Sequence, residues 1–163
     1  MNRRGFSLIE LILVMALLAV AVSVAAPSLS NFFRGRVLDS EARRVLSLAH
    51  AGQNRAVSEG FPVFLWVDAG QHKYGLEQET TAQAGDPKAL DFSVDENLQL
   101  EAVNASPVTV NGRSLPAIRF LPDGTIDDVS PATLRLLSAD GSQLFVVKSA
   151  NRLSYEIRNT NPS

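Results

Sequence analysis

One apolar stretch near the N-terminus constrains this chain more than any other feature. Residues 6–26 read FSLIELILVMALLAVAVSVAA and carry a single charge, Glu10. As an α-helix this stretch would reach about 31 Å, which matches the hydrocarbon core of a bilayer. Arg3 and Arg4 precede it, so the positive-inside bias places the N-terminus in the cytoplasm. We therefore expect a single-pass membrane anchor, with the rest of the chain outside the cytoplasmic membrane.

Two simpler interpretations of this stretch are a secretory signal peptide and a plain membrane anchor. A signal peptide would have small residues at a cleavage site, and Ala19, Val20 and Ala21 offer one. However, the apolar run continues past that site and is longer than the usual run of about 7 to 15 residues. A plain anchor leaves Glu10 without a purpose.

Glu10 is the most informative residue of the stretch. A carboxylate in the apolar part of a membrane helix costs about 2.5 to 3.5 kcal/mol, so it should have a partner or a reason. If a protease cuts after Gly5, Phe6 gains a free amine that can pair with Glu10 of a neighbouring subunit. Assembly into a filament would then neutralise two buried charges. An acid that is protonated, or that reaches the interface, is the open alternative.

The segment RRGFSLIELILVMALLA resembles the class III leader of type IV prepilins and type II secretion pseudopilins. This resemblance implies that prepilin peptidase cuts between Gly5 and Phe6 and that Phe6 is N-methylated. It also implies that Pro27 is the proline that such helices carry. The implied partners are the peptidase, other pseudopilins or minor pilins, an inner-membrane assembly platform and a secreted substrate.

The helix is expected to continue beyond Pro27, which should bend or locally melt it because proline removes one backbone hydrogen bond. Apolar residues recur at helical spacing and predict a face that packs on the rest of the chain: Leu29, Phe33, Val37, Leu38, Ala42, Val45, Ala49 and Ala56. Charged residues lie between them, and a solvated face is preferred over subunit contacts: Arg34, Arg36, Asp39, Glu41, Arg43 and Arg44. The helix should end near Gly60, because Pro62 follows.

Short β-like runs fill the remaining sequence. We expect strands at 63–67, 73–77, 90–94, 98–103, 107–110, 117–121, 133–137, 143–147 and 153–157, separated by turn signals such as Asn111–Gly112 and Pro122–Gly124. Phe64 and Trp66 should face away from Val63, Leu65 and Val67. The predicted fold is α+β, a long helix packed on an antiparallel sheet or sandwich. The expected divisions are a leader (1–5), a filament-core helix (6–26), an amphipathic helix (27–60) and a β-rich domain (61–163).

Two passages resemble the GspH/FimT-like minor pseudopilins and minor pilins: RAVSEGFPVFL (55–65) and IRFLPDG (118–124). The resemblance implies a minor pseudopilin of the H type, in the pseudopilus of a type II secretion system. The alternative is a minor type IV pilin for pilus biogenesis or DNA uptake. DNA-uptake members carry a Gly-Arg-x-Arg element, whereas this chain has Asn151, Arg152, Leu153 and Ser154. Asparagine can adopt the positive φ of that glycine, but Arg152 alone remains as a candidate DNA contact.

Charge and residue usage disfavour several other functions. Residues 28–163 contain 13 Lys or Arg against 16 Asp or Glu, so a general nucleic-acid surface is not expected. The chain has no cysteine and two distant histidines, His50 and His72, so no transition-metal site, cofactor or enzymatic activity is predicted. Asp123, Asp127 and Asp128 are candidates for calcium. The spacing of an EF-hand is absent, and an acidic turn is the preferred interpretation.

Overall fold

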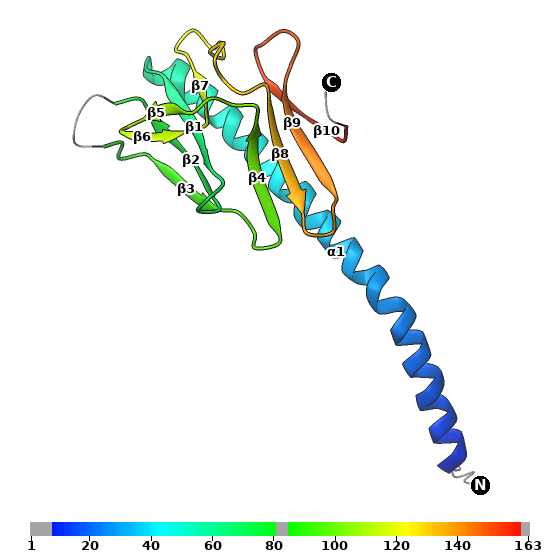
Figure 1. The fold of residues 1–163 in the computed structure, drawn as a ribbon. Helices are drawn as coiled ribbons and strands as arrows, with labels where there is room; N and C mark the ends of the chain where they lie inside the picture. Colours follow the sequence, from blue (N-terminus) through cyan, green and yellow to red (C-terminus); the bar gives the residue numbers. More distant parts are fainter. Residues whose placement is uncertain (1–7, 81–84, 161–163) are drawn as a thin grey trace, which may run out of the picture. The chain divides into compact units, whose positions relative to one another are not determined.

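The computed structural model describes residues 8–80 and 85–160, and it leaves the side chains of residues 26–34 undescribed. The described residues form one helix, α1 (Leu8–Glu59), followed by strands (Figure 1). The strands are β1 (Val63–Asp68), β2 (Lys73–Gln78), β3 (Leu90–Ser93), β4 (Leu98–Val103), β5 (Val108–Val110), β6 (Arg113–Leu115), β7 (Ala117–Phe120), β8 (Thr133–Ser138), β9 (Gln143–Lys148) and β10 (Tyr155–Arg158). The chain divides within α1 into two compact units, residues 1–36 and 37–163.

The helix α1 is continuous through residue 27. The bend expected at Pro27 stays a prediction, because the side chains around it lie outside the described part. At the other end, Gly60 adopts φ 73° and its amide donates to the carbonyl of Ala56 at 3.0 Å. This left-handed cap satisfies a carbonyl of the last turn, and glycine is suited to it because it has no Cβ. The predicted helix end is confirmed.

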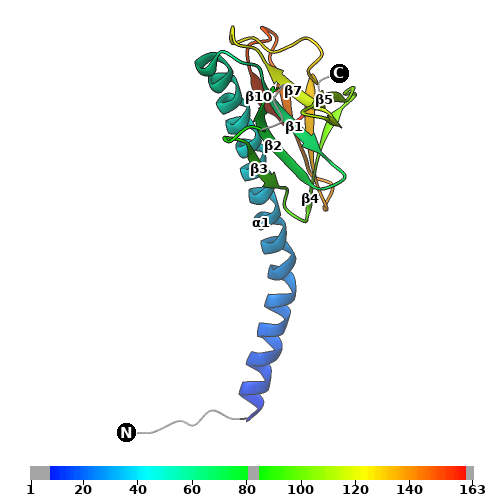
Figure 2. The ribbon, with the colours of Figure 1, turned by 90° about the vertical axis from the view of Figure 1, so that its left-hand side faces the viewer.

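The strands of the second unit form two four-stranded sheets and one hairpin (Figures 1 and 2). The first sheet has the order β3-β2-β1-β7, the second has the order β10-β9-β8-β4, and β5 pairs with β6. Every recorded strand pair in the described residues is antiparallel. The predicted α+β class with antiparallel sheets is confirmed.

Nine of the observed strands coincide, within a residue or two, with the nine expected from the sequence, and β6 is the one that was missed. The register pairs Val110 with Arg113 across a two-residue turn. Asn111 and Gly112 have φ angles of 45° and 85°, as a type I′ hairpin turn requires. The Asn-Gly pair directly after a β-like run was therefore the signal for this hairpin.

The main core forms where the second part of α1 meets both sheets. Helix residues Leu38, Ala42, Val45, Leu48, Ala49 and Ala56 are buried there with side chains from β1, β2, β4, β7, β8, β9 and β10. A Cβ added at Gly52 would lie 2.7 Å from Leu76 and 2.9 Å from Phe120, so α1 packs closely on the first sheet at this glycine. The predicted apolar face is confirmed from Leu38 to Ala56, whereas Val37 is 38% exposed. The side chains of Leu29 and Phe33 lie outside the described part.

Glu41 was predicted to lie on a solvated face of the helix, and this prediction is wrong. It is buried and its carboxylate accepts a hydrogen bond of 2.6 Å from the Tyr74 hydroxyl. Glu41 is three residues after Leu38 and four before Val45, so all three share one side of the helix. Burial is the main cause that raises the pKa of Tyr74, and the hydrogen bond to Glu41 is the second. The Tyr74 hydroxyl therefore keeps its proton and remains a donor.

A second, smaller core lies on the other face of the first sheet. Phe64 and Trp66 are buried there with Val110 and Ala117, beneath the β5–β6 hairpin. A Cβ at Gly75 would lie 2.5 Å from the Trp66 ring, so the indole packs directly on the backbone of β2. Phe64 and Trp66 thus face away from the strand residues that enter the main core, as predicted.

Candidate functional site

The first unit presents a largely apolar surface. Leu8–Ala25 is long and apolar enough to cross a membrane, and none of these side chains is buried within the described chain. Glu10 lies exposed in the first turn of α1 and is the one acidic residue of that turn. Gly5 and Phe6, the predicted cleavage and methylation residues, lie outside the described residues.

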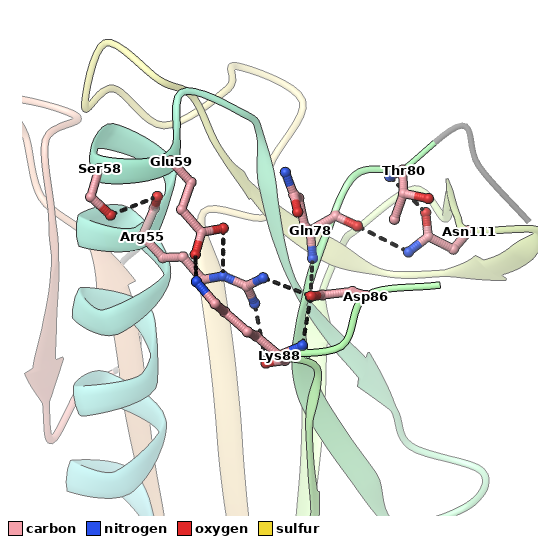
Figure 3. Close-up of polar contacts among 8 residues, drawn as sticks. All are labelled: Arg55, Ser58, Glu59, Gln78, Thr80, Asp86, Lys88 and Asn111. Atoms are coloured by element: carbon pink, nitrogen blue, oxygen red, sulfur yellow. Dashed lines mark hydrogen bonds and ion pairs between the residues drawn. The ribbon is translucent and has the colours of Figure 1, made fainter. Parts of the chain in front are cut away.

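In the second unit, the end of α1 is tied to the β structure by charged groups that the sequence analysis did not single out (Figure 3). The Arg55 guanidinium donates to Asp86 at 2.7 Å and to Glu59 at 3.0 Å. The Lys88 ammonium donates to Glu59 at 2.7 Å. These bonds join the last turns of α1 to the segment that leads into β3.

Asp86 is the centre of this network. Its carboxylate also accepts hydrogen bonds from the backbone amides of Gln78 at 2.8 Å and Lys88 at 2.9 Å. Burial alone would raise the pKa of Asp86, but the Arg55 guanidinium and the two amides outweigh it and lower the pKa to about 2. The carboxylate therefore stays charged and holds the helix end at ordinary pH.

Gln53 provides a second attachment of α1, two residues before Arg55. Its side-chain amide donates to the carbonyls of Gly124 and Leu153, each at 2.6 Å. Gly124 belongs to the predicted Pro122–Gly124 turn, which is confirmed by a hydrogen bond from its amide to the carbonyl of Leu121 at 3.0 Å. One helix residue thus fixes the loop before β8 and the loop before β10.

Arg152, the candidate DNA contact, lies in the second of those loops. Its guanidinium pairs with Asp128 at 2.7 Å, and both side chains are well exposed. Arg152 itself has the positive φ, 58°, so the left-handed position is one residue later than the Asn151 position suggested by the sequence. The two loops line a cleft of about 460 Å³, and Arg152 and Asp128 are part of its wall.

The three aspartates considered for calcium have separate partners. Asp123 accepts from the amide and hydroxyl of Thr125, whereas Asp127 pairs with Arg119 at 3.0 Å. The backbone amide of Val129, together with Arg119, lowers the pKa of Asp127 despite its partial burial. Among residues 8–80 and 85–160, no group of three or more metal-binding side chains is found.

The second unit resembles proteins of a known family. Residues 41–152 match the family described as type II transport protein GspH. The chain belongs to the GspH family. Residues 1–26 match the prokaryotic N-terminal methylation motif, in agreement with the leader recognised in the sequence. The GspH chain is therefore a pilin-like subunit of the type II secretion class.

Solved structures agree on the fold. A minor pseudopilin EpsH of the type II secretion system of Vibrio cholerae has a TM-score of 0.51 at 19% identity, over 75% of this chain and 93% of that chain. A second structure of the same pseudopilin has a TM-score of 0.50 at 18% identity, over 77% and 93%. No curated protein matches the chain. At such low identity the likeness concerns the fold, and the family assignment rests on the GspH match.

Proposed function

We propose that this chain is a minor pseudopilin that enters a type II secretion pseudopilus through its N-terminal helix. Prepilin peptidase cuts between Gly5 and Phe6, and Phe6 is then N-methylated. The apolar part of α1 holds the subunit in the inner membrane before assembly and lies in the filament core afterwards. The second unit is periplasmic, where it contacts other pseudopilins, the assembly platform or a secreted substrate.

The observation that carries this proposal is the apolar surface of Leu8–Ala25 on the same chain as a GspH domain. Its side chains are exposed in the isolated chain, so this surface must be covered by lipid or by other helices. A filament made of such helices covers it without lipid. We therefore assign filament assembly as the role of this segment.

Glu10 supplies the polar contact of that assembly. A carboxylate at the start of an apolar helix is desolvated when helices pack around it, and a neighbouring Phe6 amine offsets this penalty. The four-residue separation of Phe6 and Glu10 sets the axial offset between neighbouring subunits. Removing one partner of a buried ion pair costs about 3 to 5 kcal/mol, so the pairing would decide whether a subunit is accepted.

Mass spectrometry of the mature full-length protein tests the processing step. The mature chain should begin at N-methylated Phe6 when it is produced with a prepilin peptidase. A chain that begins at Met1, or after Ala21, would contradict the proposal.

The assembly step is tested by Glu10→Gln, which keeps the size of the side chain and removes its charge. The recovery of subunits in sheared filaments, or by cross-linking, should fall strongly. Ser23→Ala is the matched control, because the Ser23 hydroxyl donates to the carbonyl of Val20 within the same helix. Normal assembly of Glu10→Gln would refute the pairing but would leave the family assignment intact.

DNA uptake remains the competing function and is less well supported. Arg152 is held by Asp128, and the second arginine of the DNA-binding element is replaced by Ser154. A salt-dependent shift of DNA by the purified protein, lost in Arg152→Ala, would favour this alternative.

A further inference from the structure

The side chain of Asn111 attaches the β5–β6 hairpin to the end of β2 (Figure 3), next to the ion pair between Arg113 and Glu77. Its amide nitrogen donates to the carbonyl of Gln78 at 3.0 Å. Its amide oxygen accepts from the backbone amide of Thr80 at 3.2 Å. Asn111 therefore uses both a donor and an acceptor, which a carboxylate of the same shape cannot do.

The same residue stands in a chemically sensitive sequence. Asn111 is exposed to water and is followed by Gly112, and no other asparagine in the chain precedes a glycine. Glycine has no side chain to hinder the approach of its backbone nitrogen to the preceding side-chain amide. Asn104 offers a comparison within the chain, because it too has a positive φ, 51°, but Ala105 follows it.

We propose that Asn111 is a site of spontaneous deamidation and that this modification releases the β5–β6 hairpin. The backbone nitrogen of Gly112 attacks Cγ of Asn111, loses its proton to solvent base, and forms a cyclic imide. The side-chain nitrogen takes up a proton from solvent and leaves as ammonia with the electron pair of the broken C–N bond. Water then opens either carbonyl of the imide and gives aspartate or isoaspartate.

Either product weakens the attachment of the hairpin. An aspartate can still accept from Thr80, but it brings a negative oxygen against the carbonyl of Gln78 in place of a donor. Glu77 precedes Gln78 and pairs with Arg113, and Asp86 accepts from the amide of Gln78 and pairs with Arg55. The new carboxylate therefore adds a charge next to two established ion pairs. An isoaspartate adds one carbon to the backbone of a two-residue turn, whose geometry allows no extra atom.

The hairpin covers the aromatic side chains of the smaller core. Val110 packs there with Phe64 and Trp66, and the Arg113 guanidinium lies 4.6 Å from the centre of the Trp66 ring. Release of the hairpin would expose the indole of Trp66, which is 5% exposed while the hairpin is in place. Because the chain has one tryptophan, its fluorescence reports this event directly.

The first test follows the wild-type full-length chain in detergent micelles at mildly alkaline pH. Peptide mapping by mass spectrometry should show several-fold faster conversion of Asn111 than of Asn104. Equal rates would overturn the proposal. So would an Asn111 that stays an amide in the folded chain while the same residue converts in a urea-unfolded sample.

The second test compares Asn111→Asp with the control Asn104→Asp. Asn111→Asp should shift the Trp66 emission to longer wavelength and increase its quenching by acrylamide, whereas Asn104→Asp should do neither. An unchanged emission in Asn111→Asp would refute the release of the hairpin. Should Asn111→Asp fail to fold, the emission of the wild-type chain during its conversion gives the same reading.

Discussion

Gly52 shows how a single missing side chain sets the distance between α1 and the first sheet. In Gly52→Ala the new methyl group would overlap with Leu76 and Phe120, both of which are buried. Overpacking of this kind costs about 1 to 3 kcal/mol, and the better helix propensity of alanine returns up to about 1 kcal/mol. We expect the free energy of unfolding to fall by about 1 to 2 kcal/mol in urea titrations.

Gly35→Ala is the matched control for that substitution. Gly35 lies in the same helix, and nothing is found within 4 Å of a Cβ added there. Alanine should therefore leave the stability unchanged or raise it slightly. A Gly52→Ala protein as stable as Gly35→Ala would mean that the helix and sheet are not in close contact at residue 52.

Asp86 gives the protein a specific sensitivity to acid. Its folded pKa of about 2 is below its ordinary value of 3.8, so its contribution is complete above about pH 4 and disappears as the pH falls toward 2. The size of this contribution is on the order of 2 kcal/mol. Stability measured by urea titration from pH 5 to pH 2 should fall less steeply in Asp86→Asn than in the wild type.

Asp91→Asn is the control for the acid experiment. Asp91 is 60% exposed in its side chain and lies 3.9 Å from Lys73, so its loss should change stability little. If the pH dependence of Asp86→Asn matched that of Asp91→Asn, the network at the end of α1 would not be the source of the acid sensitivity.

At the scale of elements, the β5–β6 hairpin covers the smaller core, and the contribution of its buried side chain to stability can be measured. Val110 is fully buried on β5, whereas Thr109 beside it is exposed. Val110→Ala should lower the free energy of unfolding by roughly 2 kcal/mol through lost burial and a cavity beside Trp66. Thr109→Ala should be close to neutral, and equal losses in the two variants would contradict the role of the hairpin as a cover.

The order of elements was largely predictable from the sequence, and their long-range attachments were not. Helical spacing identified the buried face of α1, and turn residues separated the strands. The hairpin strand Arg113–Leu115 was missed because it holds a single apolar residue, Leu115. The bonds of Arg55 to Asp86, and of Gln53 to Gly124 and Leu153, link residues far apart in the sequence, and no local pattern indicates such partners.

The residues of the candidate site were also only partly predictable from the sequence. The leader, Phe6 and Glu10 are recognisable because membrane insertion and processing act on contiguous sequence. The burial of Glu41 was not recognisable, because a charged residue on a helix is normally solvated and its partner, Tyr74, comes from another element. Asn111 was visible only as a turn residue, and its two hydrogen bonds to the end of β2 required the structure.

For the whole molecule, the second unit should fold without the first. Its main core is built from residues between Leu38 and Tyr155, and its smaller core lies within the same range. A chain that begins at Val37 should therefore be soluble and unfold cooperatively, as measured by circular dichroism and size-exclusion chromatography. The absence of a cooperative transition would show that residues before Val37 complete the folded unit.

The two attachments at the end of α1 add to the packed face of the helix when the molecule bears a mechanical load. A pull along the helix axis reaches Gln53 and Arg55, which hold the loops before β8 and β10 and the segment before β3. These bonds lie in separate parts of the sequence and would share the force in parallel. Hydrogen bonds strained together resist rupture better than bonds opened one after another, so the end of α1 is built to withstand traction.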